Sequence, residues 1–251
     1  TSQVSQETAT PAPLPARYLL AFPPPPVAQR LQGGASDSAI EGEHRKVSII
    51  FIHLLGVNEL LDQEGPQAHL DALQRYLSCV VRLTDDNEGF LVGNDISHLG
   101  LKLILAFGAP VAHERDPANA LRLALGLHRE LPGLGVRLSH RIGINSGFVF
   151  AGEVGSPYRR EYTVMGDAVN LAARLMGAAS DSQILISKRI ADEAGPEFIV
   201  SELKPISVKG KREPVAICAL EGERTVVPVT PAEQPSTFVG RDAELDSLRA
   251  V

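Results

Sequence analysis

The sequence predicts a mixed α/β (α+β) fold in which a ferredoxin-like β-α-β-β-α-β core is followed by a C-terminal αβ extension. Apolar runs of strand length alternate with segments of helical spacing in that order along the chain. Of the 251 residues, 44% are hydrophobic, which is enough to bury one sizeable core. Turn-type residues separate the runs, and we find no internal repeat.

In chain order, the expected elements are a strand at 47–55, a helix at 57–83, strands at 89–93 and 101–108, a helix at 116–131, strands at 136–144 and 147–153, a helix at 167–178, a strand at 183–187, a short helix at 188–194 and a closing β region at 197–219.

The first elements follow from local patterns. The run VSIIFIHLL at 47–55 is apolar almost throughout, as in a central strand that is buried on both faces. Residues 57–83 carry leucines at helical spacing, which predicts one amphipathic helix. The turn-prone Gly93-Asn94-Asp95 separates the next two strand-like runs.

The later elements follow from similar signals. Asp116-Pro117 is a typical helix start, and a proline after residue 131 stops the apolar periodicity. Asn145-Ser146-Gly147 lies between two strand-like runs and predicts a hairpin-like junction. The closing segments alternate again between helical and strand patterns, which gives the C-terminal extension.

The flanking segments differ in composition from the expected domain at 46–221. Residues 1–45 are rich in Ser, Thr, Pro, Ala and Gly and include four consecutive prolines, so we expect a linker. Residues 222–237 are Pro-, Thr- and Val-rich and predict a second linker. Residues 238–251 look like the start of a further domain, so we expect the chain to be a piece of a longer protein.

Composition and charge exclude several classes of function. The net charge is -6 and aromatic residues make up 5%, which argues against a nucleic-acid partner or an anionic membrane surface. No apolar run reaches the roughly 18 residues of a membrane-spanning helix. Cys79 and Cys218 are too few and too isolated for a disulfide framework, so we expect reduced, buried thiols and a cytoplasmic protein.

Two stretches of the sequence resemble the class III adenylyl and guanylyl cyclase family. The first is EYTVMGDAVNLAAR at 161–174, in which a strand leads through a glycine into a helix. The second is RIGINSG at 141–147, continued by GEVG at 152–155. The resemblance covers roughly residues 46–220 and implies the class III cyclase fold, whose active sites form between two such domains.

The resemblance implies that Asn170 and Arg174 are catalytic. Their spacing of four residues places both on one helical face. In the family reaction the ribose 3′-hydroxyl attacks the α-phosphorus and pyrophosphate leaves. A planar guanidinium is suited to the charge that builds on the phosphate oxygens, and the Asn would orient the ribose.

The two metal-binding aspartates of the family are missing. In this sequence His53 occupies the place of the first, in the line FIHLLGV, and Leu101 occupies the place of the second. Imidazole is a poor ligand for a hard, oxygen-seeking Mg²⁺, so we expect no metal site in this chain. Asp95 lies six residues earlier, in the expected turn, too far along the chain to replace the second aspartate.

Two further positions match nucleotide contacts of the family. Thr163 stands where the family places a residue that hydrogen-bonds the purine, and Lys209 matches a lysine that reaches the triphosphate. In the most similar members a lysine that contacts adenine directly precedes the glycine matched by Gly100. Here that position is Leu99, which weakens the case for ATP over GTP.

A domain that keeps the Asn and Arg but lacks both aspartates resembles the second cyclase domain of soluble, bicarbonate-responsive-type adenylyl cyclases. In those proteins, cyclase domains precede a P-loop ATPase module. The segment FVGRDAEL at 238–245 is similar to the opening of such a module. The resemblance implies that an aspartate-bearing cyclase domain, within the same protein or on another chain, binds Mg²⁺ or Mn²⁺. This chain would then provide the other half of a site that converts ATP to cyclic AMP and pyrophosphate, and alone it would be inactive or very weak.

Two alternatives stay open at this point. The chain is also compatible with a degenerate regulatory domain that binds a nucleotide or an effector without turnover, which His53 and Leu99 favour. It is further compatible with a dimerisation module, including a homodimer, that couples an upstream domain to the ATPase. A ferredoxin-like RNA-binding domain has little support, because the aromatic strand motif is missing and the charge is acidic.

Overall fold

The computed structural model of the protein describes residues 42–97, 100–135, 137–156 and 159–224. Most of the expected linkers at 1–45 and 222–237 lies outside the described residues, and so do Leu99 and the segment at 238–251. No helix in the described part of the chain is long and apolar enough to cross a membrane.

In chain order, the elements are β1 (Glu43–Leu55), α3 (Val57–Glu64), α4 (Pro66–Asp86), β2 (Phe90–Ser97), β3 (Gly100–Phe107), α5 (Asp116–Glu130), the 3₁₀ helix η1 (Leu131–Leu134), β4 (Ser139–Ser156), β5 (Arg159–Met165), α6 (Asp167–Ala178), β6 (Ile184–Ser187), α7 (Lys188–Ala194), β7 (Phe198–Ile206) and β8 (Val215–Glu223).

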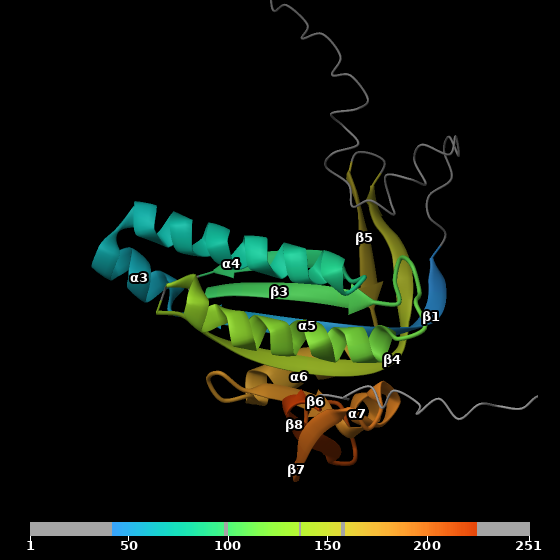
Figure 1. Ribbon diagram of the computed structural model, residues 1–251. Helices are drawn as coiled ribbons and strands as arrows, with labels where there is room; N and C mark the ends of the chain where they lie inside the picture. The colour runs from blue at the N-terminus through green and yellow to red at the C-terminus, as the bar shows by residue number, and fades with distance from the viewer. Residues whose placement is uncertain (1–41, 98–99, 136, 157–158, 225–251) are drawn as a thin grey trace, which may run out of the picture.

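The strands form one eight-stranded sheet in the order β2-β3-β1-β4-β6-β8-β7, with β5 paired to β4 (Figure 1). The first four strands in this order, with α4 and α5 as connections, make the ferredoxin-like core. The remaining strands and α7 make the C-terminal extension. The predicted fold class is therefore confirmed.

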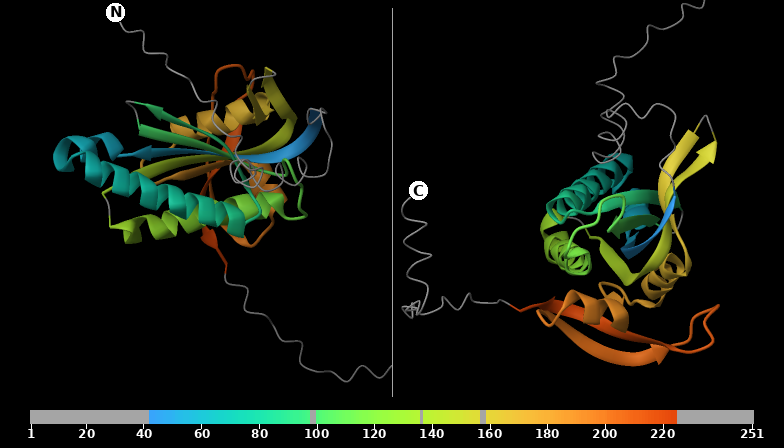
Figure 2. Two further views of the ribbon diagram at one scale, coloured as in Figure 1. Left: turned by 90° about the horizontal axis from the view of Figure 1, so that it is seen from above. Right: turned by 90° about the vertical axis from the view of Figure 1, so that its right-hand side faces the viewer.

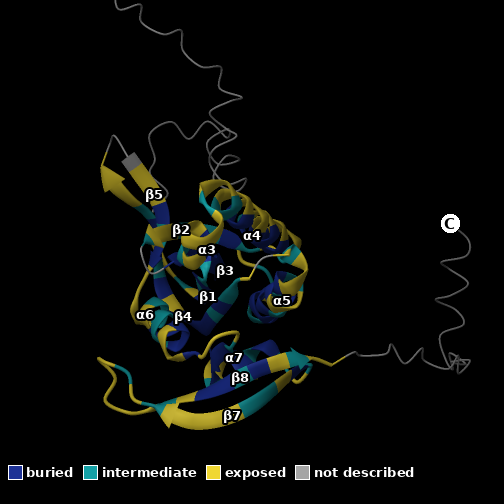
Figure 3. Ribbon diagram, turned by 90° about the vertical axis from the view of Figure 1, so that its left-hand side faces the viewer, coloured by how far each residue is buried: buried dark blue, intermediate teal, exposed yellow. Residues whose placement is uncertain are grey.

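The two faces of the sheet are covered by different helices. On one face, α4 and α5 pack on apolar side chains such as Ile52, Leu103 and Ile144, which are fully buried. On the other face, Ile49 of β1 belongs to a second cluster that includes Ala172 of α6. Figure 2 and Figure 3 show α6 on the opposite side of the sheet from α4 and α5. The exposed part of this second face is where the candidate site lies.

The prediction of a single helix at 57–83 is wrong in one respect, because two helices occupy this region. α3 ends at Glu64, and Gly65 has a φ of +87°, in the left-handed region that favours glycine. Pro66 then opens α4 at a position where a helix needs no backbone N–H donor. The Gly-Pro pair ends one helix and starts the next.

The turn expected at Gly93-Asn94-Asp95 is also wrong. These residues belong to β2, which continues to Ser97, and Asp95 pairs with Lys102 of β3. The pairing register of β2 with β3 shifts between Leu91 and Gly93, where β2 has a β-bulge. β2 is at the edge of the sheet, where exposed polar residues are tolerated and blunt the edge against unwanted pairing.

The hairpin-like junction expected at Asn145-Ser146-Gly147 does not exist either, because all three residues lie inside the continuous strand β4. Their polar and small side chains serve packing instead of a turn. The Asn145 side chain donates a hydrogen bond of 2.9 Å to the carbonyl oxygen of Ala168, and the Ser146 hydroxyl bonds Glu193. The hairpin in this region is the pairing of β4 with β5, which projects beyond the sheet (Figure 1).

Candidate functional site

The helix α6 is held unusually close to the sheet by glycines of β4. A Cβ atom on Gly143 would lie 2.1 Å from the backbone nitrogen of Met176 and 2.3 Å from the carbonyl oxygen of Ala172. A Cβ atom on Gly147 would lie 2.8 Å from the Cβ of Ala168. Any side chain at Gly143 would push the helix away, so this residue sets the height of α6 above the sheet.

The outer face of α6 carries Asp167, Asn170 and Arg174. Their spacing of three and four residues places them in one row along the helix. Asn170 is exposed and Arg174 is partly buried. The structure therefore places the two residues predicted as catalytic on one face of one helix.

The turn between β7 and β8 reaches this face. Lys211 forms an ion pair with Asp167, at the first turn of α6. Gly210 lies beside the Arg174 guanidinium, since a Cβ atom on this glycine would be 3.6 Å from Nη2 and 3.9 Å from Nη1. The φ of Gly210 is +86°, which glycine adopts without strain and which brings the backbone of the turn this close to Arg174.

The guanidinium of Arg174 is only partly satisfied. Its Nη1 atom is buried, and no hydrogen-bond acceptor for it exists among the described residues. Arg174 also forms no ion pair with any residue in the described part of the chain. A buried N–H group without an acceptor lowers the stability of the fold. This atom is therefore suited to donate a hydrogen bond to an oxygen of a bound anion.

Lys209 and Thr163 are placed differently. Lys209 is exposed and directly precedes Gly210, so the β7–β8 turn brings it to the side of α6 that carries Arg174. Thr163 lies on β5 opposite Gly152 of β4 and is partly buried. The hydrogen bonds and ion pairs among the described residues include none between Thr163 and the other three predicted residues, although β5 leads directly into α6.

His53 lies in a row of charged residues across the face of the sheet that carries α6. The register pairs it with Lys102 of β3 on one side and with Arg141 of β4 on the other. Asp95 of β2 extends the row beyond Lys102, and Arg141 donates hydrogen bonds of 2.6 and 2.8 Å to Asp181. The neighbours of His53 on both adjacent strands are thus cationic.

Leu101 points the other way. It is 1% exposed and belongs to the core cluster beneath α4 and α5, on the opposite face of the sheet from His53. A leucine offers no ligand atom, and an imidazole between two cations does not favour a divalent metal ion. Among the described residues, no group of three or more His, Cys, Asp or Glu side chains is placed to hold a metal ion. These positions do not fit Mg²⁺ or Mn²⁺.

The contact between Lys211 and Asp167 was not predicted from the sequence. The available signal was the VKGK motif, in which a glycine separates Lys211 from Lys209 and allows a tight turn. Only the tertiary structure assigns different surroundings to the two lysines. Lys211 binds the start of α6, while Lys209 is exposed next to Gly210.

A comparison with family models matches residues 40–222 to the model described as the adenylate and guanylate cyclase catalytic domain. Among curated proteins, an uncharacterised protein of Mycobacterium tuberculosis is 31% identical over 188 residues, which is 72% of this chain and 33% of that protein. A second uncharacterised protein of the same organism is 34% identical over 135 residues, which is 53% of this chain and 24% of that protein. The chain thus matches about a quarter to a third of the length of these relatives.

Solved structures of cyclases share the fold. The adenylyl cyclase CyaB from P. aeruginosa has a TM-score of 0.68 and 25% identity, with 74% of this chain and 98% of that chain covered. The guanylate cyclase domain of RhGC from Catenaria anguillulae, in complex with GTP, has a TM-score of 0.64, with 72% of this chain and 100% of that chain covered. At 19% identity, the second likeness concerns the fold alone.

Proposed function

This chain belongs to the adenylate and guanylate cyclase catalytic domain family, and we propose that it supplies one half of a composite nucleotidyl cyclase site. Domains of this family bind nucleotide and act as dimers or pseudo-dimers. In our proposal, Asn170 and Arg174 provide the transition-state contacts, Thr163 contacts the base and Lys209 contacts the triphosphate. A partner domain with two aspartates provides the metal ions, Mg²⁺ or Mn²⁺.

The reaction proposed for the composite site is the conversion of ATP to cyclic AMP. The ribose 3′-oxygen forms a bond to the α-phosphorus as its hydroxyl proton is transferred to water. The bond between that phosphorus and the oxygen that bridges to the β-phosphate breaks, and pyrophosphate departs. Negative charge develops on the α-phosphate oxygens, where the Arg174 guanidinium can stabilise it, while the Asn170 amide orients the ribose.

The observation that carries this proposal is the state of Arg174. Its guanidinium lies beside the glycine of a turn that also carries Lys209, and its Nη1 is buried without an acceptor among the described residues. An arginine with a purely structural role is expected to donate its N–H groups to carboxylate or carbonyl oxygens of the same domain. An arginine with a spare donor beside a lysine-bearing turn is suited to a phosphate group.

The composite arrangement also accounts for His53 and Leu101. A half that leaves metal binding to its partner has no need of carboxylates at these positions. We further propose that the chain corresponds to the second cyclase domain of a longer cytoplasmic protein, with the domain at 46–221 between two linkers and an ATPase-like module starting at 238–251. The partner would be an aspartate-bearing domain of the same protein or of another chain.

Reconstitution tests the proposal. This chain is mixed with a cyclase domain that has both aspartates but lacks the Asn and Arg, and cyclic AMP formation is measured with Mg²⁺ and with Mn²⁺. We expect activity from the mixture and little or none from this chain alone. Activity of the isolated chain equal to that of the mixture would show that no aspartate-bearing partner is required.

Arg174 variants in the same mixture test the residue itself. Arg174→Ala should cost on the order of 3 kcal/mol of transition-state stabilisation, or about a hundredfold in kcat, with a smaller change in KM. Arg174→Lys should recover only part of this loss, because an ammonium cannot reproduce the two-pronged guanidinium contact. Arg129→Ala, on the exposed end of α5, is the matched control and should leave the rate unchanged. A rate that is indifferent to Arg174→Ala would exclude the catalytic role.

A second candidate function is a regulatory domain that binds a nucleotide or effector without turnover. Lys102 and Arg141 on either side of His53 favour it, because their cationic groups can contact an anionic ligand and disfavour a metal ion at His53, although Asp95 and Asp181 offset part of their charge. In that case, calorimetry would detect nucleotide binding to the isolated chain, and reconstituted mixtures would stay inactive.

A further inference from the structure

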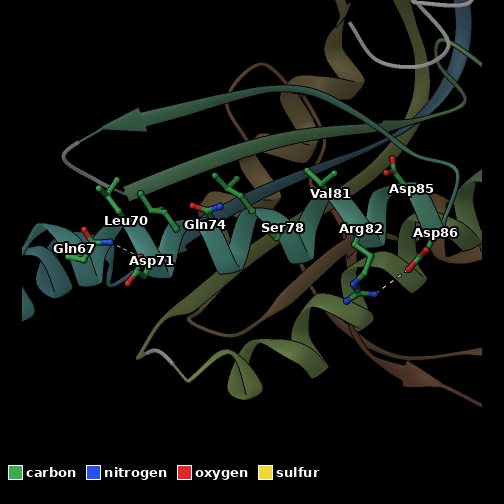
Figure 4. Close-up of a pocket in the computed structure, with 11 residues that line it drawn as sticks. Gln67, Leu70, Asp71, Gln74, Ser78, Val81, Arg82, Asp85 and Asp86 are labelled. Carbon is green, nitrogen blue, oxygen red and sulfur yellow. Dashed lines mark hydrogen bonds and ion pairs between the residues drawn. The ribbon is translucent and has the colours of Figure 1, made fainter. Parts of the chain in front are cut away.

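The outer flank of α4 carries an apolar stripe on the opposite side of the sheet from α6. The stripe consists of Leu70, Leu77 and Val81, which are interrupted by the polar Gln74. The four residues are spaced three or four apart and are therefore aligned along the helix. Leu70 is 58% exposed and Val81 is 44% exposed. A groove of about 940 Å³ follows this flank (Figure 4).

The stripe faces away from the rest of the helical layer. On the neighbouring flank, Arg82 forms an ion pair with Glu130 of α5, which marks the side of α4 that faces α5. In Figure 4, Leu70, Gln74 and Val81 point away from α5 and toward the strand at the edge of the sheet. The stripe thus borders β2, the edge strand.

Acidic side chains accompany the apolar stripe. Asp71, Asp85 and Asp86 line the groove together with one basic residue, Arg82, so its rim carries an excess of negative charge. Asp71 accepts a hydrogen bond from Gln67 and Asp86 pairs with Arg82. Asp85 forms no ion pair with any residue in the part of the chain that the structure describes. A fitting occupant is therefore apolar and positively charged.

One segment of this chain has that chemistry. Residues 16–31, ARYLLAFPPPPVAQRL, contain Tyr, Leu, Phe and Val side chains and two arginines, Arg17 and Arg30, but no acidic residue. The four prolines restrict its backbone, which lowers the entropy cost of binding in an extended form. We propose that residues 16–31 dock in the α4 groove, with Leu19, Leu20 and Phe22 on the apolar stripe and the arginines at the acidic rim.

The topology allows the segment to reach the groove. β1 ends just before α3, and α4 then runs back along the sheet, so the end of α4 and the start of β1 lie at the same end of the molecule (Figure 1). Only about a dozen residues separate residue 31 from Glu43, a span of roughly 35–40 Å when extended. α4 itself, with 21 residues, is about 32 Å long. The segment can therefore lie along the whole stripe.

A tethered segment also has an advantage over a separate molecule. A short flexible linker gives an effective concentration in the millimolar range, far above that of a free copy of the chain. A second copy of this chain is thus the weaker competitor for the groove. Docking would cover exposed apolar side chains and would connect whatever precedes the domain to the layer of α4 and α5.

The test uses the full chain, which contains no tryptophan. Val81→Trp places a single fluorescent reporter on the stripe, and its emission maximum is measured in two backgrounds. One background is otherwise unchanged, and the other carries Leu19→Ser, Leu20→Ser and Phe22→Ser. We expect emission at shorter wavelength in the unchanged background and a shift to longer wavelength, with stronger acrylamide quenching, in the triple variant.

Matched controls separate docking from other causes. Val4→Ser with Leu14→Ser removes apolar residues outside 16–31 and should leave the emission unchanged. Circular dichroism should be the same for all variants, since none of these substitutions except Val81→Trp lies within the described domain. Equal emission maxima in the two backgrounds would overturn the proposal. A maximum that moves on dilution would overturn it as well, because it would identify a second copy as the occupant.

Charge-reversal variants give an independent test of the docking. Arg17→Glu with Arg30→Glu should expose the Val81→Trp reporter, and Asp71→Lys with Asp85→Lys should do the same. Combining the four changes should restore the original emission at least in part, since opposite charges again face each other. If the combined variant is no less exposed than either pair alone, the charged rim does not select this segment and the assignment of the segment is wrong.

Discussion

Lys211, in the turn between β7 and β8, forms an ion pair with Asp167 at the start of α6. The same turn places Gly210 beside the Arg174 guanidinium. One ion pair at the surface thus helps to hold a lysine-bearing turn over the helix face that carries Asn170 and Arg174. We expect this ion pair to contribute little to the stability of the domain and more to the position of the turn in the candidate site.

Lys211→Ala should barely change stability, because both partners of the ion pair are largely exposed and such pairs contribute at most about 1 kcal/mol. In a reconstituted cyclase mixture, however, it should raise KM for the nucleotide more than it lowers kcat, since the turn that carries Lys209 becomes less constrained. Asp167→Asn should have the same effect. A proportional loss of kcat with unchanged KM would contradict this role of the turn.

The two positions that replace the family aspartates should respond differently to restoration of a carboxylate. His53→Asp should change the free energy of unfolding by no more than about 1 kcal/mol, because its cross-strand neighbours Lys102 and Arg141 are cationic. Leu101→Asp should destabilise the domain by at least about 3 kcal/mol, since that side chain is 1% exposed in the core. Urea unfolding of both variants measures the difference, and equal costs would contradict the two faces assigned here.

Gly143→Ala should destabilise the domain by at least about 2 kcal/mol, because its Cβ would lie within 2.3 Å of backbone atoms of α6. Gly177→Ala is the matched control on α6 itself. Apart from the adjacent residues and the helix's own backbone, no atom lies within 4 Å of the Cβ position there, and alanine favours helix formation by up to about 1 kcal/mol. Thermal unfolding should therefore shift in opposite directions, and a neutral Gly143→Ala would show that α6 is not fixed by this contact.

His140 should make the domain sensitive to mild acid. Burial, with a smaller effect of the neighbouring His128, lowers the pKa of His140 from 6.5 to about 4. Its Nδ1 lies 3.3 Å from the Tyr76 hydroxyl, and its Nε2 is buried without a partner among the described residues. The folded state therefore resists protonation while the unfolded state takes up a proton below pH 6.5. Stability is fully present above this pH and is lost as the pH falls toward 4.

The expected loss from this residue is about 2 kcal/mol between pH 7 and pH 5, from the linkage of one proton. Urea unfolding at several pH values measures it. His140→Gln removes the titrating group and should flatten the profile over this interval, even if it lowers stability at pH 7. An unchanged pH profile in the variant would assign the acid sensitivity to other groups.

Much of the fold follows from local sequence patterns. The apolar run at 47–55 is the central strand β1, and the periodic segments at 116–131 and 167–178 are α5 and α6 with nearly the expected bounds. The spacing of Asn170 and Arg174 alone places them on one helical face. Three expectations failed. The helix at 57–83 is divided at Gly65-Pro66, and the turn-type residues Gly93-Asn94-Asp95 and Asn145-Ser146-Gly147 lie inside strands.

The sequence by itself determined most of the order of the elements, the common face of Asn170 and Arg174, and the replacement of two carboxylates by His53 and Leu101. These properties depend on residue type and on spacing within one element. Only the tertiary structure placed the β7–β8 turn beside Arg174 and set His53 between two cations. These relationships depend on strand register and on contacts between distant segments, which local sequence patterns do not encode.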